Sequence, residues 1–202
     1  LENAPGTEYE YATINYDVLA LIIQKITGES FESYLQREVI DELKLAQTTI
    51  GIPFNLEQMS TGYKISYLSA RPYDAPVFKG NNAAGYVISN STDMASWLKF
   101  QMGLMDSDLY TQAKFTHQRD QTVGIHGESS YAAGWEVSLD GTGEIYHAGL
   151  NPNFSSFVSF RKKEGIGIVI LTNSNSSYTN FLGSHIQKML ANEELLSELD
   201  PN

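Results

Sequence analysis

The chain has 202 residues, no cysteine and a net charge of −11. Its length is sufficient for one sizeable hydrophobic core. The absence of cysteine excludes a disulfide scaffold, a thiolate nucleophile and a Cys-ligated zinc site. The negative charge argues against binding to nucleic acid, which needs clustered Lys and Arg, and against docking on anionic lipid.

The first half of the sequence predicts helices separated by an irregular segment. Apolar residues recur with a helical period over Tyr16–Thr27, which predicts a helix buried on one face and ended by Gly28. Ser30 is the expected N-cap of a second helix, Phe31–Leu45. Residues 47–82 have weak periodicity and several Pro and Gly, so we expect an irregular surface segment there. A third helix is expected over Asp93–Leu104.

The second half changes to strands and tight turns. Four β-rich segments are separated by turn residues such as Asp140-Gly141: Ala132–Leu139, Glu144–His147, Phe154–Arg161 and Ile166–Thr172. A final helix is predicted over Tyr178–Leu190. The expected fold is α+β, with a helical part followed by an antiparallel sheet and a C-terminal helix. We expect one structural domain, with a mainly helical part over 1–130, the sheet part over 131–192 and an acidic tail over 193–202.

A nucleophile for acyl transfer is not evident in the sequence. There is no Gly-x-Ser-x-Gly segment, and Ser-x-x-Lys occurs at Ser96–Lys99 and Ser159–Lys162. The first pair lies on the polar face of a predicted helix, which predicts that both residues point to solvent. The second lies on a predicted strand, where residues three apart point to opposite faces. Neither pair is therefore expected to act as nucleophile and base.

Several motifs resemble the serine β-lactamase-like family, which contains class C β-lactamases, D-Ala-D-Ala carboxypeptidases, D-aminopeptidases and related esterases. They occur in the order of that family and cover nearly the whole chain: Tyr11-Ala12-Thr13 after Pro5-Gly6, Ala84-Gly85-Tyr86 before Asp93-Met94-Ala95, Tyr131-Ala132-Ala133-Gly134-Trp135, and His147-Ala148-Gly149. Each motif alone is weak, but the ordered set is specific. The resemblance implies a β-lactamase/transpeptidase-like fold.

The resemblance also implies roles for particular residues. Tyr11 would move protons between nucleophile and leaving group, and His147 would offer a polar or cationic partner to substrate or to Tyr11. Thr13 stands where the family usually has Asn and would contact substrate. The substrate would lie along Ala148 and Gly149, and the N–H of Leu150 would be one oxyanion donor.

The implied function is that of a serine acyl hydrolase working through an acyl-enzyme on a peptide, ester or β-lactam. In the family a Ser-x-x-Lys motif precedes the Tyr motif, so we expect this chain to be a C-terminal part that lacks the nucleophile and is inactive alone. Whether this chain alone is an enzyme therefore stays open. The alternative is a non-catalytic, penicillin-binding-protein-like module that binds peptidoglycan-like ligands or a partner.

Cofactors and partners follow from the same reasoning. No cofactor is expected, and the histidines His117, His126 and His185 match no metal-ligand spacing. The expected partner is a small-molecule or peptide substrate, with no nucleic acid. Surfaces left exposed by the missing part would favour self-association. Family resemblance implies a location outside the cytoplasm, at the cell envelope.

Overall fold

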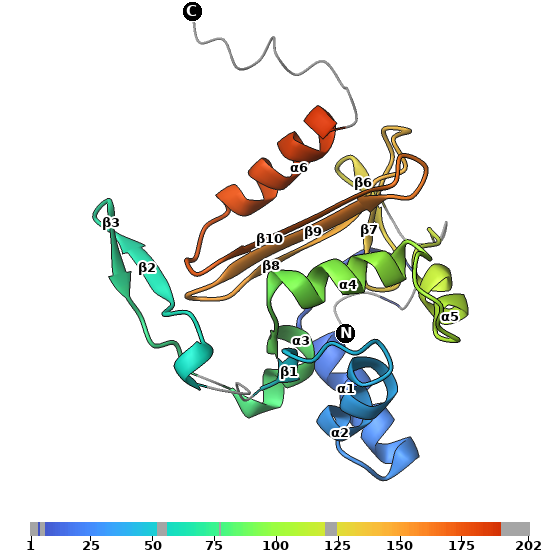
Figure 1. Ribbon diagram of the computed structural model, residues 1–202, viewed down its shortest axis with the longest axis horizontal. Coiled ribbons are helices and arrows are strands. Elements are labelled where there is room, and N and C mark those ends of the chain that lie inside the picture. The colour runs from blue at the N-terminus through green and yellow to red at the C-terminus, as the bar shows by residue number, and fades with distance from the viewer. Residues whose placement is uncertain (1–3, 5–6, 52–55, 77, 120–124, 191–202) are drawn as a thin grey trace, which may run out of the picture.

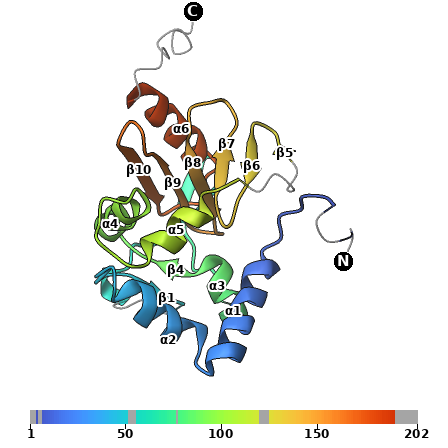
Figure 2. The same ribbon diagram turned by 90° about the vertical axis from the view of Figure 1, so that its right-hand side faces the viewer.

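The computed structural model describes residues 4, 7–51, 56–76, 78–119 and 125–190. Its centre is an antiparallel sheet of six strands in the order β10-β9-β8-β7-β6-β5, in which every strand pairs with its neighbour in sequence. Helices cover both faces of this sheet, and further helices lie beyond one of them (Figures 1 and 2). The α+β class with an antiparallel meander is therefore confirmed. The predicted acidic tail, 193–202, lies outside the described residues.

The strands of the six-stranded sheet are short at one edge and longer at the other: β5 (Ile125–His126), β6 (Ser129–Tyr131), β7 (Glu136–Ser138), β8 (Ile145–Leu150), β9 (Ser155–Arg161) and β10 (Ile166–Thr172). The turn between β9 and β10 uses Gly165 at φ 70°, a conformation that glycine adopts at little cost. Residue for residue, Ile166 pairs with Arg161 and Thr172 with Ser155. The two longest strands thus form an unbroken ladder under the helices.

The two faces of the sheet pack against different helices. On one face, α4 (Ser91–Gln101) places Leu98 in a core with Trp135 and Phe160 of the sheet. On the other, Gly183 of α6 (Tyr178–Leu190) lies so close to Phe157 that an added Cβ would come within 2.1 Å of its ring. Since residues 157 and 160 point to opposite sides of β9, the two helices sandwich the sheet (Figure 1).

Further elements lie beside the sheet: α1 (Ile14–Thr27), α2 (Phe31–Leu35), the π-helix η1 (Gln36–Ile40), β1 (Thr49–Ile50), the 3-10 helices η2 (Leu56–Gln58) and η3 (Lys79–Asn81), α3 (Asn82–Gly85), β4 (Val87–Ile88) and α5 (Tyr110–Thr116). Residues of α2, η1, β1, α4 and α5 and of the segments next to them form a second core. Ile40, Leu43 and Phe100 are the most deeply buried members of this core. No helix in the described part of the chain is long and apolar enough to cross a membrane.

The first helix differs from the sequence expectation in its burial. Gly28 ends α1 at φ 77° as predicted, but α1 has no buried residue. Its apolar side chains are largely exposed, with Leu19 at 54%, Leu21 at 64% and Ile26 at 79%. The prediction of a buried face was wrong for the described chain: α1 packs mainly against the short elements α2, α3 and η3, and its residues are at most partly buried.

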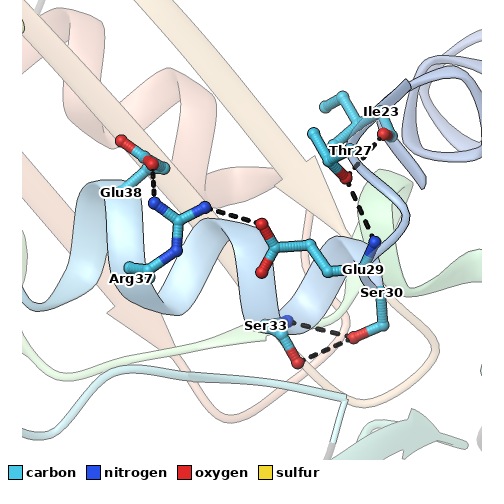
Figure 3. A network of polar contacts seen from close by, with 7 residues as sticks. All are labelled: Ile23, Thr27, Glu29, Ser30, Ser33, Arg37 and Glu38. Carbon is cyan, nitrogen blue, oxygen red and sulfur yellow. Dashed lines mark hydrogen bonds and ion pairs between the residues drawn. The ribbon is translucent and has the colours of Figure 1, made fainter. Parts of the chain in front are cut away.

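The corner between α1 and α2 is held by polar contacts (Figure 3). Ser30 caps α2 as predicted, accepting a hydrogen bond from the Ser33 backbone N–H at 3.1 Å. Arg37 bridges Glu29 at 2.6 Å and also contacts Glu38. These exposed ion pairs contribute little to stability, whereas the cap fixes where the helix begins.

The second helical segment is shorter than the sequence predicts. The predicted helix Phe31–Leu45 ends at Ile40, and Lys44 adopts φ 56°, which is incompatible with a continuing right-handed helix.

The region predicted to be irregular contains a hairpin of β2 (Tyr63–Ser66) and β3 (Ser69–Pro72), which stands away from the body in Figure 1. Its strands are too short and too exposed to give an alternating pattern.

Candidate active site

Tyr11 and His147, the two residues predicted to act together, lie beside each other. Tyr11 precedes the first turn of α1, and His147 is in the middle of β8. Their ring centroids are 6.3 Å apart. The fold thus joins two segments that are separated by most of the chain, at the boundary between the helical part and the sheet (Figure 2).

Two further tyrosines complete the group, and sequence reasoning did not assign them a role in the site. The Tyr131 hydroxyl is 3.2 Å from Nε2 of His147 and also hydrogen-bonds the Tyr16 hydroxyl. Tyr131 ends β6 and Tyr16 belongs to α1, so their contact ties the helix to the sheet. Tyr131 was visible only as the first residue of a motif, and nothing in its spacing indicates a contact with His147.

Aromatic packing fixes the tyrosine rings. Tyr11 meets Tyr131 edge-on at 5.7 Å between centroids, and Tyr9 packs on the same ring at 5.6 Å. Such edge-to-face and tilted pairs restrain the rings as well as burying apolar area. Tyr11 nevertheless remains 49% exposed, so this residue is accessible to a ligand.

The electrostatics of the site keep its phenols protonated. Burial raises the pKa of Tyr11 above 10, and Tyr16 and Glu136 raise it further. Burial and the hydrogen bond to Tyr16 raise the pKa of Tyr131 much further. A tyrosine that accepts protons near neutral pH needs a lowered pKa, supplied by a nearby cation. Within the described chain, no cation is among the causes that shift the pKa of Tyr11.

His147 is shifted toward its neutral form. Burial lowers its pKa below 6.5, while a hydrogen bond with the Ala148 backbone and the charge of Glu136 partly oppose that shift. A neutral imidazole has one ring nitrogen that donates and one that accepts. The hydrogen bond between the Tyr131 hydroxyl and Nε2 couples the tautomer of His147 to this contact: if the hydroxyl donates, the imidazole hydrogen is on Nδ1.

Glu136 is the anionic neighbour of the site, and sequence reasoning missed it. Its Oε2 accepts hydrogen bonds from Ser129 Oγ at 2.6 Å and from the Tyr146 hydroxyl at 3.0 Å. Its charge adds to the effect of burial, which raises the pKa of Tyr146 to about 12. The site therefore combines a fixed negative charge with protonated phenols and a neutral imidazole.

The other predicted site residues are close to Tyr11 and His147 in the chain. Thr13 precedes α1, is exposed and makes no side-chain capping hydrogen bond. Gly149 follows His147 on β8, and a Cβ there would be 2.5 Å from Ser156 Oγ. Ala148, Gly149 and Leu150 line one side of a hollow of about 110 Å³ whose opposite side is the start of α6. Leu150 is 60% exposed.

Neither Ser-x-x-Lys pair belongs to the site. Ser96 Oγ donates to the backbone of its own helix, Thr92 O, at 3.3 Å, and Lys99 is exposed. Ser159 is completely buried in β9, whereas Lys162 Nζ donates to His117 Nδ1 at 2.9 Å. Lys99 is exposed as expected but Ser96 is only partly so, and Ser159 is buried whereas Lys162 is exposed. Among the described side chains, no group of three His, Asp or Glu is placed to hold a metal ion.

Comparisons with known proteins agree with these motifs. Residues 1–192 match the Beta-lactamase family. Protein flp of Staphylococcus aureus strain MW2 is 30% identical over 199 residues, which are 98% of this chain and 40% of that protein. The chain thus spans less than half the length of this relative.

Solved structures show the same fold. A penicillin-binding protein homologue from Pyrococcus abyssi, described as octameric, superposes with a TM-score of 0.81 at 20% identity, over 94% of this chain and 44% of that one. A class C β-lactamase superposes with a TM-score of 0.77 at 21% identity, over 99% and 60%. The fold is therefore β-lactamase/transpeptidase-like, and the chain belongs to the Beta-lactamase family.

Proposed function

We propose that the site around Tyr11 and His147 takes part in acyl transfer on a peptide, ester or β-lactam through a serine acyl-enzyme. The observation that carries this proposal is the 6.3 Å approach of the two rings, from the two matching motifs. The Tyr11 hydroxyl would pass a proton to the leaving group, a step for which a protonated phenol is suited. The neutral His147 would help to orient that hydroxyl and the substrate.

The strand after His147 would hold the reacting carbonyl. Gly149 has no side chain on β8, and Ser156 Oγ fills the place of its Cβ, so a substrate beside Gly149 would meet backbone atoms. Leu150 N–H is the proposed oxyanion donor, and Thr13, exposed at the start of α1, is the proposed contact to the substrate side chain. Because Thr has one hydroxyl where an Asn amide both donates and accepts, amide recognition would be weaker than with Asn.

The nucleophile and its lysine are proposed to come from polypeptide outside these 202 residues. Two observations support this: neither internal Ser-x-x-Lys pair contacts the site, and the chain covers 40% of Protein flp. A neighbouring lysine would also lower the pKa of Tyr11, which burial raises in the chain alone. We therefore propose that the 202-residue chain has no hydrolytic activity by itself.

The test compares the chain with a longer polypeptide that contains it and a Ser-x-x-Lys helix. Both are assayed with a chromogenic cephalosporin, p-nitrophenyl acetate and a D-Ala-D-Ala peptide, and acylation is followed by intact mass. We expect turnover or acylation only in the longer protein, lowered at least about a hundredfold by Tyr11→Phe. Tyr34→Phe on α2, away from the site, is the matched control. Activity of the 202-residue chain, abolished by Tyr11→Phe, would refute the need for an external nucleophile.

Two observations favour the alternative, a module that binds ligands without chemistry. The raised pKa of Tyr11 disfavours its action as a base, and Thr13 stands where the family usually has Asn. Saturable binding of the same substrates by the longer protein, with neither turnover nor acylation, would favour this reading.

The proposed location is outside the cytoplasm, and fractionation of cells producing the longer protein tests it.

A further inference from the structure

The tip of the β2–β3 hairpin exposes two large apolar residues. Tyr67 is 96% exposed and Leu68 is 101% exposed, more than any other large apolar side chain in the described chain. Ser66 pairs with Ser69, so Tyr67 and Leu68 alone form the turn. No part of the described chain covers them.

The backbone conformation of the turn does not favour these two residues. Tyr67 has φ 50° and Leu68 has φ 62°, the pair of positive values that defines a type I′ hairpin turn. Asn-Gly is the favoured sequence for this turn, and bulky residues there are strained. The chain thus keeps an apolar pair at a position where a polar pair would fold more easily, which points to a role in contact.

The base of the hairpin is fixed, so the tip is presented at a defined place. Tyr63 N donates to Asn173 O at 2.9 Å, and Asn175 N donates back to Tyr63 O at 3.3 Å. Directly after β3, the carbonyl of Tyr73 accepts a hydrogen bond from Asn153 Nδ2 at 3.2 Å. The hairpin is therefore anchored beside the end of β10, and its tip stands clear of the body (Figure 1).

The charge of this segment is opposite to that of the chain. Residues 58–73 contain no Asp or Glu, although the chain carries a net charge of −11. Lys64 and Arg71 pair across the hairpin and share one face with its serines, because cross-strand partners point to the same side. Ile65, 57% exposed, pairs with Ala70 on the other face. The hairpin is thus amphipathic, with an apolar tip and paired cations behind it.

We propose that this hairpin docks the protein on an anionic lipid bilayer, with Tyr67 and Leu68 inserted at the interface. A convex tip enters a soft surface, whereas a protein partner would need a matching pocket. Tyrosine is suited to the boundary between headgroups and acyl chains, and Lys64 and Arg71 would meet lipid phosphates. The proposal does not depend on the catalytic one.

The acidic body does not prevent such docking. Four residues per strand, at about 3.3 Å per residue, give the hairpin a reach of roughly 13 Å. The Debye length at physiological salt is about 8 Å, so most of the body's repulsion from an anionic surface is screened at that distance. The expectation from net charge alone, which opposed binding to anionic lipid, does not apply to a cationic element that projects this far.

The first test is cosedimentation with vesicles of phosphatidylcholine, with and without phosphatidylglycerol. We expect binding that is at least about tenfold stronger with phosphatidylglycerol and that weakens as salt is raised. The key variant is Tyr67→Asn with Leu68→Gly, which installs the favoured turn and should leave folding intact or improved. It should lower vesicle binding about tenfold or more, and Leu104→Ser, at a residue 67% exposed elsewhere, should not.

A site-specific probe reports insertion directly. The chain has no cysteine, so Leu68→Cys can be labelled with an environment-sensitive fluorophore at one place only. A blue shift on addition of the anionic vesicles is expected, and its absence would overturn the proposal. Equal vesicle binding by the Asn-Gly variant would also overturn it. So would a concentration-dependent mass without lipid that the Asn-Gly variant abolishes, if vesicles do not bind, since the tip would then contact a second copy.

Discussion

The hydroxyl oxygen of Tyr131 lies 3.2 Å from Nε2 of His147 and also contacts the hydroxyl of Tyr16. This relay joins α1 to two strands of the sheet. It engages Nε2 of His147. His147 is therefore arranged as an oriented, neutral partner of the tyrosine group, and its position depends on Tyr131.

Replacing Tyr131 by Phe should remove the hydrogen bond that orients the ring of His147. The ring contacts remain possible, but both hydrogen bonds are lost, and we expect a loss of about 1–3 kcal/mol in the free energy of unfolding. In the native chain, nitrogen NMR of His147 should show the hydrogen on Nδ1, and the variant should show a mixture of tautomers. Tyr34→Phe serves as control. A native His147 with its hydrogen on Nε2 would contradict the relay.

His117 should make stability depend on pH. It is 8% exposed, and Nε2 is 2.6 Å from Gln101 Oε1, while Lys162 Nζ donates to Nδ1. Burial, and then the charge of Lys162, lowers its pKa from 6.5 to about 4. The unfolded chain thus binds more protons between these values, so this contribution to stability is complete above pH 6.5 and is lost as the pH falls to 4. The loss should reach up to about 3 kcal/mol.

Urea unfolding at several pH values checks the role of His117. The variant His117→Gln keeps a side chain that can hydrogen-bond both neighbours but does not titrate. Its stability should fall less steeply between pH 6.5 and 4 than that of the native chain. Parallel profiles for the two proteins would show that His117 does not carry the effect.

Gly183→Ala should loosen α6 from the sheet. The added methyl group would lie 2.1 Å from a ring carbon of Phe157, which is almost fully buried and cannot move freely. We expect a loss of about 1–3 kcal/mol despite the better helix propensity of alanine, seen as a lower Tm. Gly80→Ala, where no atom lies within 4 Å, should change Tm little.

Gly149→Ala should strain β8 through a single contact. The new Cβ would meet Ser156 Oγ at 2.5 Å, and the next atom is 3.9 Å away. The single substitution should cost roughly 1 kcal/mol, and Ser156→Ala should relieve most of that cost. Unfolding of the two single variants and the double variant gives the coupling energy. Additive effects would mean that the strand adjusts without Ser156.

The exposed apolar side of α1 should drive self-association of the 202-residue chain. Leu21 is 64% exposed and Ile26 is 79% exposed on this helix. Light scattering after size exclusion should give a mass that rises with concentration. Leu21→Glu with Ile26→Glu should reduce it, because glutamate preserves helix propensity and removes apolar area. Leu104→Glu is the control, and a constant monomeric mass in the native chain would contradict the prediction.

The sequence predicted the last two strands and the final helix better than the rest. It missed β5 and β6, which belong to the sheet although the part up to residue 130 was predicted to be mainly helical. The strands β9 and β10 are bounded by turn residues and were located to within a residue, and α6 was located at both ends. The end of α2 was missed because a π-turn and Lys44 at positive φ leave no mark in hydrophobic periodicity. The hairpin β2–β3 was missed because two four-residue strands, mostly exposed, have no apolar alternation.

The site was predicted in part. Tyr11 and His147 were found because each belongs to a recognisable motif, and the structure brings them together. Tyr131, Tyr16 and Glu136 were missed as members of the site because their contacts depend on how α1 meets the sheet. Such contacts between distant segments have no local sequence signal.

The order of the strands in the sheet indicates that the sheet and the site form at different stages of folding. Every strand of the six-stranded sheet pairs with its neighbour in sequence, so the sheet closes only short loops as it forms. The contact between Tyr16 and Tyr131 spans 115 residues, and closing a loop of that length costs roughly 2 kcal/mol more chain entropy than closing one of about ten residues. The sheet should therefore acquire its native pairing first, and the tyrosine group should be among the last parts of the molecule to form.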